Sequence, residues 1–431
     1  MALCNLRPRT LSVVSFLAAI AVGIMTPRSA KAVPAFARKY DLKCYSCHTM
    51  PPALNKTGYM FKRLGYRFPP DEMDGTKLAP KLSELDKNIK FNLTDSVALV
   101  TRGSFSTDKV TGDTPSSASS FNLDEAALFL AGTVPQTNFS YFAQAELSQN
   151  GQQTSMEQAL MVYTGGRANS SYFARAGMMH MQEGEGTRAA MFYNLFPEPS
   201  LILTDINPLN FTLDQHPVGI AGGYTWASNY FKQIFAVTAK VTNGLNADGS
   251  EILTNSTKNS KDFWFDADYW FGPDGGLTFL TYHGTKDQIQ NQGTPDEFTY
   301  RPTVRRYGVF GNYYFFDKLD VLGGYLRSSD DWKDVANGAL SKLTANALRA
   351  EVDYYVRRGT AVTARFDYLS RKLGGVTYGT AKGWAVGAQR ALVERGNIVI
   401  RATYAHERDT DPSMTQPAID KNFTLDLRLM W

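Results

Sequence analysis

Short segments in which apolar and polar residues alternate strictly fill most of this 431-residue chain. In the last segment every second residue from Phe423 to Trp431 is apolar, and Thr424, Asp426 and Arg428 lie between them. A period of two residues is that of a β-strand whose two faces meet different surroundings. After about residue 87 no helical period extends over a useful length. The pattern predicts a protein that is mostly β-sheet.

Two further segments carry the same alternation. Residues 348–356 alternate apolar side chains with Arg349, Glu351 and Asp353, and residues 139–147 repeat the pattern. The polar faces of these segments bear charges of both signs. Such strands occur in soluble β-sandwiches and in transmembrane β-barrels, so the alternation alone is compatible with both.

The connections between the segments favour a barrel. Long polar stretches alternate with short turns such as 134–136, 272–275 and 358–359, as external loops and periplasmic turns do in outer-membrane proteins. The long stretches lie at 106–119, 182–216, 243–260, 285–300, 328–343 and 407–421. Fifteen connections predict sixteen antiparallel strands over residues 88–431, with about 21 residues for each strand and its connection. We therefore expect an all-β, sixteen-stranded transmembrane barrel in contact with outer-membrane lipid.

Two further expectations follow from such a barrel. A polar inner face accounts for a mean hydropathy of −0.29 in a membrane protein. The longest connection, residues 182–216, follows the fifth strand. General porins fold a loop inward at this place, so by analogy we expect this connection to lie in the lumen.

The first 32 residues predict export by the general secretory route. Arg7 and Arg9 precede an apolar run, Leu11–Met25, and Ala30-Lys31-Ala32 offers a cleavage site for signal peptidase. These residues contain four basic side chains and no acidic one, so 41 of the 45 basic residues remain after cleavage, against 41 acidic residues. A neutral chain lacks the basic excess that neutralises phosphates, so nucleic acid is excluded as a partner.

One short motif points to a specific chemistry. Cys44-Tyr45-Ser46-Cys47-His48 has the spacing that attaches c-type haem, in which two thiolates add to two vinyl groups and the adjacent imidazole takes the iron from the proximal side. The sequence predicts one covalent haem c, held through Cys44 and Cys47, with His48 as the proximal iron ligand. We assign no catalytic residue, because the redox chemistry would be that of the iron.

Paired cysteines also occur in redox dithiols and in zinc sites. A thioredoxin-like dithiol lies in a βαβ pattern, which this sequence lacks, and zinc requires two more ligands at finger-like spacing. The distal iron ligand stays unassigned among Met50, Met60 and Met73. Met50 lies too close to His48 to reach the opposite face of a haem, Met60 is expected to pack in a core with Phe61 and Leu64, and Met73 is expected in a loop.

The residues that carry a family resemblance are Val33-Pro34-Ala35-Phe36-Ala37-Arg38, the Cys44–His48 motif, Pro52, Leu54, Gly58, Phe61 and Leu64-Gly65-Tyr66. They resemble the N-terminal region of the outer-membrane fused monohaem cytochrome c-porins. This chain has Met50 and Pro51 where members often have an aromatic residue. The resemblance implies a small α-helical haem domain before a sixteen-stranded barrel, oxidation of extracellular Fe(II), and electron delivery to periplasmic c-type cytochromes.

The expected organisation is a signal peptide (1–32), a haem domain with its linker (33–87) and the barrel (88–431). A single haem cannot carry electrons by tunnelling across an apolar band about 25 Å tall unless it lies within that band. Sixteen-stranded barrels enclose an aqueous lumen, and Pro69, Pro70 and Gly75 suit a return of the chain into it. We therefore expect the haem domain to plug the lumen.

Three functions are compatible with this organisation. Electrons could pass inward from an extracellular donor such as Fe(II), which would make the protein an oxidoreductase. The barrel could instead be a diffusion porin or transporter whose haem plug is structural or sensory. Electrons could also pass outward to an external acceptor, because the sequence does not set the haem potential.

Weaker candidates for a site lie in the barrel segment. Soft ligands occur at residues 178–181, Met-Met-His-Met, but alternation sends them to opposite faces, so ordinary packing is favoured. Acidic stretches at 330–334 and 407–411 could attract Fe(II), although solvated loop charge is the favoured interpretation. His216, His283 and His406 are far apart in the sequence and show no metal-binding spacing.

Overall fold

The computed structural model describes residues 35–40, 42–51, 53–68, 81, 96–148, 155–180, 190, 196, 201, 215–228, 231–243, 261–272, 274–285, 288–290, 298–300, 302–333, 340–392, 398–410 and 416–430. Residues Val33–Trp431 belong to one compact unit. The predicted signal peptide, most of the predicted linker and Trp431 lie outside the described residues.

Sixteen antiparallel strands close into a barrel, which confirms the predicted all-β, sixteen-stranded barrel. The strands are β3 (Val97–Thr111), β4 (Ser116–Thr133), β5 (Phe139–Ser148), β6 (Ser155–Arg167), β7 (Ser170–Met178), β8 (Val218–Ala227), β9 (Ile234–Thr242), β10 (Asp262–Phe271), β11 (Gly275–Thr285), β14 (Thr303–Phe315), β15 (Leu319–Lys333), β16 (Leu340–Arg357), β17 (Thr360–Leu373), β18 (Val376–Ala391), β19 (Ile398–Thr410) and β20 (Ala418–Met430). Each strand pairs with its neighbours in sequence order, and β20 pairs with β3 to close the ring. Between β11 and β14, β12 (Gln288–Gln290) and β13 (Phe298–Tyr300) form a separate hairpin.

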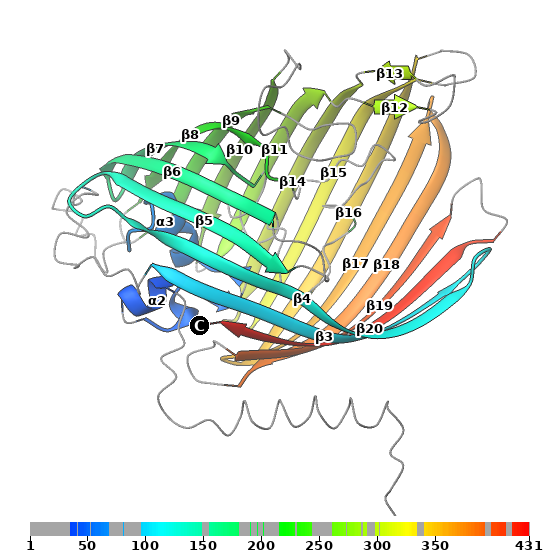
Figure 1. Cartoon of the computed structure of the whole chain (residues 1–431), viewed down its shortest axis with the longest axis horizontal. Coiled ribbons are helices and arrows are strands. Elements are labelled where there is room, and N and C mark those ends of the chain that lie inside the picture. Colours follow the sequence, from blue (N-terminus) through cyan, green and yellow to red (C-terminus); the bar gives the residue numbers. More distant parts are fainter. Residues whose placement is uncertain are drawn as a thin grey trace, which may run out of the picture. The chain divides into compact units, whose positions relative to one another are not determined.

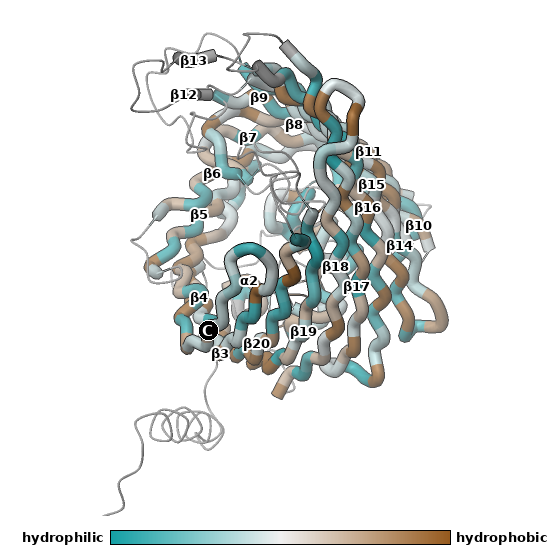
Figure 2. The backbone as a smooth tube through the Cα atoms, turned by 90° about the vertical axis from the view of Figure 1, so that its right-hand side faces the viewer, coloured by the Kyte–Doolittle hydropathy of each residue, from teal (hydrophilic) through white to brown (hydrophobic). Residues whose placement is uncertain are grey.

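The two faces of each strand differ as the alternation predicts. On β16, Leu348 and Val352 are 44% and 40% exposed, whereas Arg349 and Asp353 are 2% and 0% exposed. Hydrophilic and hydrophobic colours accordingly alternate along the strands in Figure 2. Apolar side chains therefore face outward, toward lipid, and polar side chains face the lumen.

The stretches predicted as long loops are in part strand. Residues 106–119 belong mostly to β3 and β4, whose ladder leaves only residues 112–115 between them. Ser106 and Ser120 face each other there, with their hydroxyl oxygens 3.2 Å apart. Residues 328–343 likewise continue β15 and β16. The sequence suggested loops because these strand ends lack an apolar face, but a hairpin that extends beyond the membrane does not need one.

The barrel has two distinct ends. Short turns gather at one of them, named here the short-turn end, and they include residues 168–169, 272–274, 316–318 and 358–359. Phe316 and Asp317 have φ of 53° and 55°, the left-handed conformation that a two-residue hairpin turn requires. The opposite end, the long-loop end, carries β12 and β13 (Figure 1). In outer-membrane barrels short turns face the periplasm and long loops face the outside.

The N-terminal segment contains α2 (Ala35–Lys39), a 3-10 turn (Cys44–Ser46), β1 (His48–Met50), β2 (Ala53–Leu54) and α3 (Lys56–Arg63). The Asn55 side chain caps α3 by accepting a hydrogen bond of 2.9 Å from the Gly58 N–H. Figure 1 shows both helices near the short-turn end. The described part of residues 33–87 thus holds two short helices and a two-stranded hairpin, within the same compact unit as the barrel. None of the helices in the described ranges is long and apolar enough to cross a membrane.

Val352→Arg tests the outward assignment of the apolar face. A guanidinium near the middle of the lipid-facing band should lower the free energy of unfolding by about 2–4 kcal/mol. The measurement is urea unfolding in lipid vesicles, followed by tryptophan fluorescence. Val376→Arg is the matched control, because Val376 is 72% exposed beside the Gly374-Gly375 turn, and there we expect a change below about 1 kcal/mol. Equal losses in the two variants would contradict the assignment.

Candidate functional site

The cysteine motif forms one tight turn. The Ser46 N–H donates to the Lys43 carbonyl at 2.9 Å, and the Cys47 N–H donates to the Cys44 carbonyl at 3.2 Å. In a 3-10 turn the side chains of residues i and i+3 eclipse, so Cys44 and Cys47 lie on the same side. Neither cysteine forms a disulfide, and Cys44 is buried. Two thiols on one side, followed directly by His48, fit covalent attachment to the two vinyl groups of one haem.

The residues after the motif fix its backbone. Asn55 donates from its N–H to the Cys47 carbonyl at 3.0 Å, and its side-chain amide donates to the Tyr45 and Ser46 carbonyls at 3.4 and 3.3 Å. A Cβ on Gly58 would lie 2.2 Å from the Cys47 carbonyl oxygen. Only glycine allows α3 to approach the motif so closely, and the turn is therefore held rigidly against the helix.

Two of the three methionine candidates lie in apolar clusters. Met50 is fully buried and packs with Ala53 of β2 and with Tyr355 and Ala361 of the barrel. Met60 packs with Leu64 and with barrel residues of β8–β10, as expected for a core residue. Met73 lies outside the described residues. The distal ligand therefore stays unassigned.

Arg63 attaches α3 to the inner wall of the barrel. Its guanidinium donates to the hydroxyls of Thr225 and Thr238 at 2.9 and 2.7 Å, and to the carbonyls of Tyr224 and Val237 at 3.1 and 3.0 Å. Arg63 is only 2% exposed. Hydrogen bonds to a charged group contribute about 1.5–3 kcal/mol each, so these four bonds stabilise the docking of the segment on the barrel.

Tyr59, one helical turn before Arg63, faces the same wall. Its hydroxyl donates to the Asp268 carboxylate at 2.8 Å, and its ring centroid lies 5.1 Å from that of Trp270. Burial and the neighbouring Asp268 raise the pKa of Tyr59, so the phenol stays protonated and able to donate. The i, i+4 spacing of Tyr59 and Arg63 is the sequence signal by which this contact face could have been recognised. Their barrel partners have no comparable signal, because they are distant in the sequence.

The segment also contacts several turns of the short-turn end. The Lys56 ammonium donates to the carbonyls of Gly272 and Lys232, the latter at 3.2 Å, and the Lys56 N–H donates to Asp274 at 2.8 Å. Burial lowers the pKa of Lys56, while Asp274 acts in the opposite direction. The segment therefore lies at the periplasmic end of the barrel and not midway along it.

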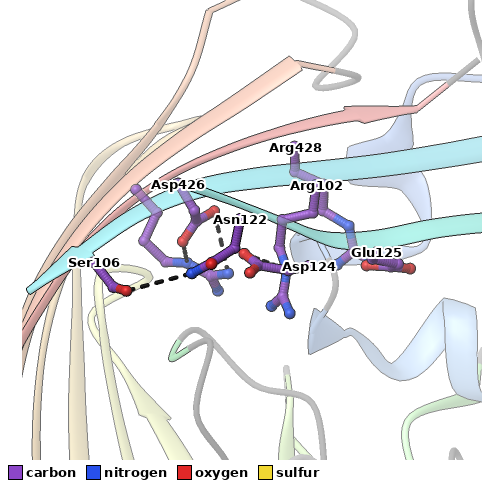
Figure 3. Close-up of polar contacts among 8 residues, drawn as sticks. Arg102, Ser106, Asn122, Asp124, Glu125, Asp426 and Arg428 are labelled. Atoms are coloured by element: carbon purple, nitrogen blue, oxygen red, sulfur yellow. Dashed lines mark hydrogen bonds and ion pairs between the residues drawn. The ribbon is translucent and has the colours of Figure 1, made fainter. Parts of the chain in front are cut away.

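Paired charges line the lumen on the opposite side. Figure 3 shows part of this wall, which β3, β4 and β20 form. Arg102 lies 3.6 Å from Asp124, and Arg428 lies 3.3 Å from Glu125. Asp426 is also paired, with Arg401 of β19 at 2.7 Å. Fixed charges of both signs give the lumen a hydrated wall without a large net field.

The longest connection contacts this lumen at its described residues. Ala190 and Leu201 pack with the inward-facing apolar side chains Leu280 and Phe310. Phe196 is 3% exposed and lies under the Arg365 guanidinium, 4.7 Å from ring centroid to Cζ. The expectation that this connection folds inward is confirmed at these three positions.

Two histidines that are far apart in sequence meet in the structure. His180 follows β7 and His216 precedes β8, and because these strands are paired, the ring centroids lie 4.6 Å apart. His216 is also 3.9 Å from the Glu157 carboxylate. Sequence spacing missed this pair, since the longest connection separates the two residues. Within the described ranges, however, no group of three or more His, Cys, Asp or Glu side chains is arranged to hold a metal ion.

The acidic stretches are not free iron-attracting loops at their described residues. Asp330 is fully buried on β15 and forms an ion pair with Arg306. Asp331 pairs with Lys342, and Asp409 pairs with Arg371 at 3.3 Å. The prediction that these positions lie in loops was wrong, because both stretches continue strands whose neighbours supply cations.

No protein-family model matches the chain, and no curated protein matches it. Solved structures are similar in fold. The anion-selective porin of Comamonas acidovorans is 11% identical, with a TM-score of 0.54 over 78% of this chain and 99% of the porin chain. OprB of Pseudomonas putida is 9% identical, with a TM-score of 0.54 over 78% and 94% of the two chains, and OmpT of Vibrio cholerae is 12% identical, with 0.53 over 78% and 97%. The chain therefore has the porin fold, and its predicted location in the bacterial outer membrane is confirmed.

Arg63→Ala tests how the segment is held. Loss of the four hydrogen bonds should weaken docking by on the order of 3 kcal/mol, about a 100-fold shift toward an undocked segment. Single-channel recordings in planar bilayers should then show more frequent transitions to a larger conductance. Lys421→Ala, at an exposed position of the long-loop end, should leave the recordings unchanged. An Arg63→Ala trace identical to wild type would show that the segment does not depend on this residue.

Cys47 allows a pH test on haem-free protein. Burial, with a smaller contribution from Cys44, raises the pKa of the Cys47 thiol to about 12. At pH 8 the thiolate fraction is then about 1,000-fold below that of a thiol with a pKa near 9. In a Cys44→Ala variant, iodoacetamide labelling should be slow at pH 8 and should rise about tenfold per pH unit up to pH 11. Urea-unfolded protein is the control, and its labelling rate should level off near pH 9. Equal labelling rates in folded and unfolded protein would contradict the raised pKa of Cys47 in the folded protein.

Proposed function

We propose that this outer-membrane barrel carries one covalent haem c and passes electrons between an extracellular donor, Fe(II), and a periplasmic c-type cytochrome. The observation that carries the proposal is the 3-10 turn that sets two cysteine thiols on one side, directly before His48. Cys44 and Cys47 would tether the cofactor and His48 would be the proximal iron ligand. The group would supply reversible one-electron chemistry. The resemblance to fused cytochrome c-porins supports the same reading.

The position of the motif decides how a donor would reach it. β16 has 18 residues, so a tilted wall of this length rises on the order of 40 Å. Tunnelling from the outside to the short-turn end is therefore too slow, and the donor must enter the barrel. Arg102, Asp124 and Glu125 give a hydrated route for a small cation, whereas a solid or protein donor would be excluded. In this proposal, one barrel combines porin-like entry with a haem near its periplasmic end.

Docking by Arg63 and Tyr59 would serve this role in two ways. It fixes the motif at the end where periplasmic carriers lie. It also keeps the motif within the barrel end, where a donor that diffuses along the lumen meets it. The residues of the chain would thus position the cofactor and control access to it.

A second candidate is a diffusion porin or transporter whose haem is structural or sensory. The similarity of the barrel to porins, including one from Comamonas acidovorans, favours it. A third arrangement reverses the flow, with electrons leaving to an external acceptor. A redox titration compared with the Fe(III)/Fe(II) couple at the working pH distinguishes inward from outward flow.

Electron transfer is tested in liposomes that carry the haem-loaded protein. External Fe(II) should reduce ferric cytochrome c trapped inside. The Cys44→Ala/Cys47→Ala variant should carry no covalent haem, and its rate should fall to that of protein-free liposomes. His48→Ala should retain haem in denaturing gels, because the thioethers remain, but with an altered Soret band. If the wild type leaves the trapped cytochrome c oxidised while sugars cross at the rate of an open porin, the protein is a diffusion porin and the proposal of electron transfer is wrong.

A further inference from the structure

Among the described residues of the short-turn end, the exposed charges are almost all positive. Five of them border the N-terminal segment and are named here the basic rim: Lys43, Lys232, Lys318, Arg357 and Arg358. Lys81 and Arg390 are further exposed basic residues at this end. Among the described residues of the same end, Asp317 is the exposed acidic residue. The long-loop end is different, because there exposed charges of both signs alternate, as at Lys109, Asp113, Arg408, Asp420 and Lys421.

The basic rim lies directly beside the cysteine motif. The Arg358 guanidinium carbon is 5.2 Å from the ring centroid of Tyr45, between the two cysteines in sequence. A Cβ on Gly359 would lie 2.6 Å from the Tyr45 hydroxyl, so this turn is in close contact with the motif. Lys43 immediately precedes the 3-10 turn.

Lys318 and Lys232, two other residues of the basic rim, contact residues that pack around the cysteine motif. The Lys318 carbonyl accepts from the N–H of Tyr355, whose ring packs in the cluster of Met50. The Lys232 carbonyl accepts from Lys56 at the start of α3. The rim therefore adjoins the segment at several barrel turns that are far apart in the sequence.

The excess of positive charge at the basic rim is a local feature. Within the lumen, basic side chains such as Arg349 and Arg401 are paired with carboxylates. At the rim, several cations lie near one another on an exposed surface, and a positive surface of this kind attracts an anionic partner. The chain after residue 32 has equal numbers of basic and acidic residues, so overall composition does not produce the excess.

We infer that the basic rim is the docking surface for an acidic c-type cytochrome of the periplasm. This inference rests on the proposed function and names the charge of its partner. The transfer moves one electron from the reduced protein to the ferric iron of the partner, with no bond made and no proton moved. Opposite charges steer such encounters and raise association rates by about 10- to 1,000-fold at low salt. Rim contacts of this kind act on the rate of encounter more than on final affinity.

The test compares two sets of neutral substitutions in haem-loaded protein. The rim variant carries Lys232→Gln, Lys318→Gln and Arg357→Gln, which spares the two residues next to the cysteines. The control carries Lys109→Gln, Arg408→Gln and Lys421→Gln at the long-loop end. Stopped-flow absorbance measures the second-order rate at which each dithionite-reduced protein reduces an acidic ferric c-type cytochrome. A basic c-type cytochrome of similar potential and uncharged benzoquinone are the comparison acceptors.

We expect the wild-type rate with the acidic cytochrome to fall at least tenfold between 10 and 500 mM salt. The rim variant should be about tenfold slower than wild type at 10 mM salt and nearly independent of salt. The control should stay within twofold of wild type, and benzoquinone should oxidise all three proteins equally.

Several results would overturn the inference. One is an equal rate for wild type and rim variant with the acidic cytochrome, and another is a faster rate with the basic cytochrome. If the rim variant loses only its binding to vesicles of phosphatidylglycerol, the rim contacts lipid headgroups and the inference is wrong. Failure of the proposed function looks different, because a protein without covalent haem would fail with benzoquinone as well.

Discussion

The closed hydrogen-bond ladder is the constraint on which the rest of this structure depends. In lipid, each unpaired backbone N–H or C=O costs several kcal/mol, so a sheet can cross a bilayer only if it has no free edge. Pairing of β20 with β3 removes that edge. Closure then sends alternate side chains outward and inward, which explains why Val352 is exposed while Asp353 is buried on the same strand. The lumen and its charges follow from this geometry.

The closed wall also provides the hydrogen-bond partners that hold the N-terminal segment against the barrel. Arg63 finds its acceptors on β8 and β9, and Tyr59 finds Asp268 on β10. Three adjacent strands thus provide one receptor surface for α3. The cysteine turn is fixed to α3 because Gly58 of this helix is in close contact with the Cys47 carbonyl. The porin fold and the cysteine motif are therefore one structural unit, although their sequence signals are independent.

Periodicity and turn spacing were sufficient to predict the sixteen strands, and the Cys44–His48 motif needed no structure to be noticed. Strand ends were not predictable in this way, because Ser106 and Ser120 pair without any apolar signal. Contacts between distant segments were also out of reach: nothing in the sequence joins His180 to His216, or Arg63 to Thr238. Such pairs depend on register and closure, which local patterns do not encode.

The hydrogen bonds of Arg63 also bear on the order of assembly. Their acceptors on β8 and β9 are brought together only when those strands pair, so α3 has no docking site on an unfolded chain. Once docked, Cys47 is only partly exposed, and burial raises the pKa of its thiol to about 12, which leaves little reactive thiolate. In the proposed haem-bearing protein, covalent attachment at this cysteine would therefore be favoured on the periplasmic chain before the barrel closes around it, and cofactor loading would precede membrane insertion.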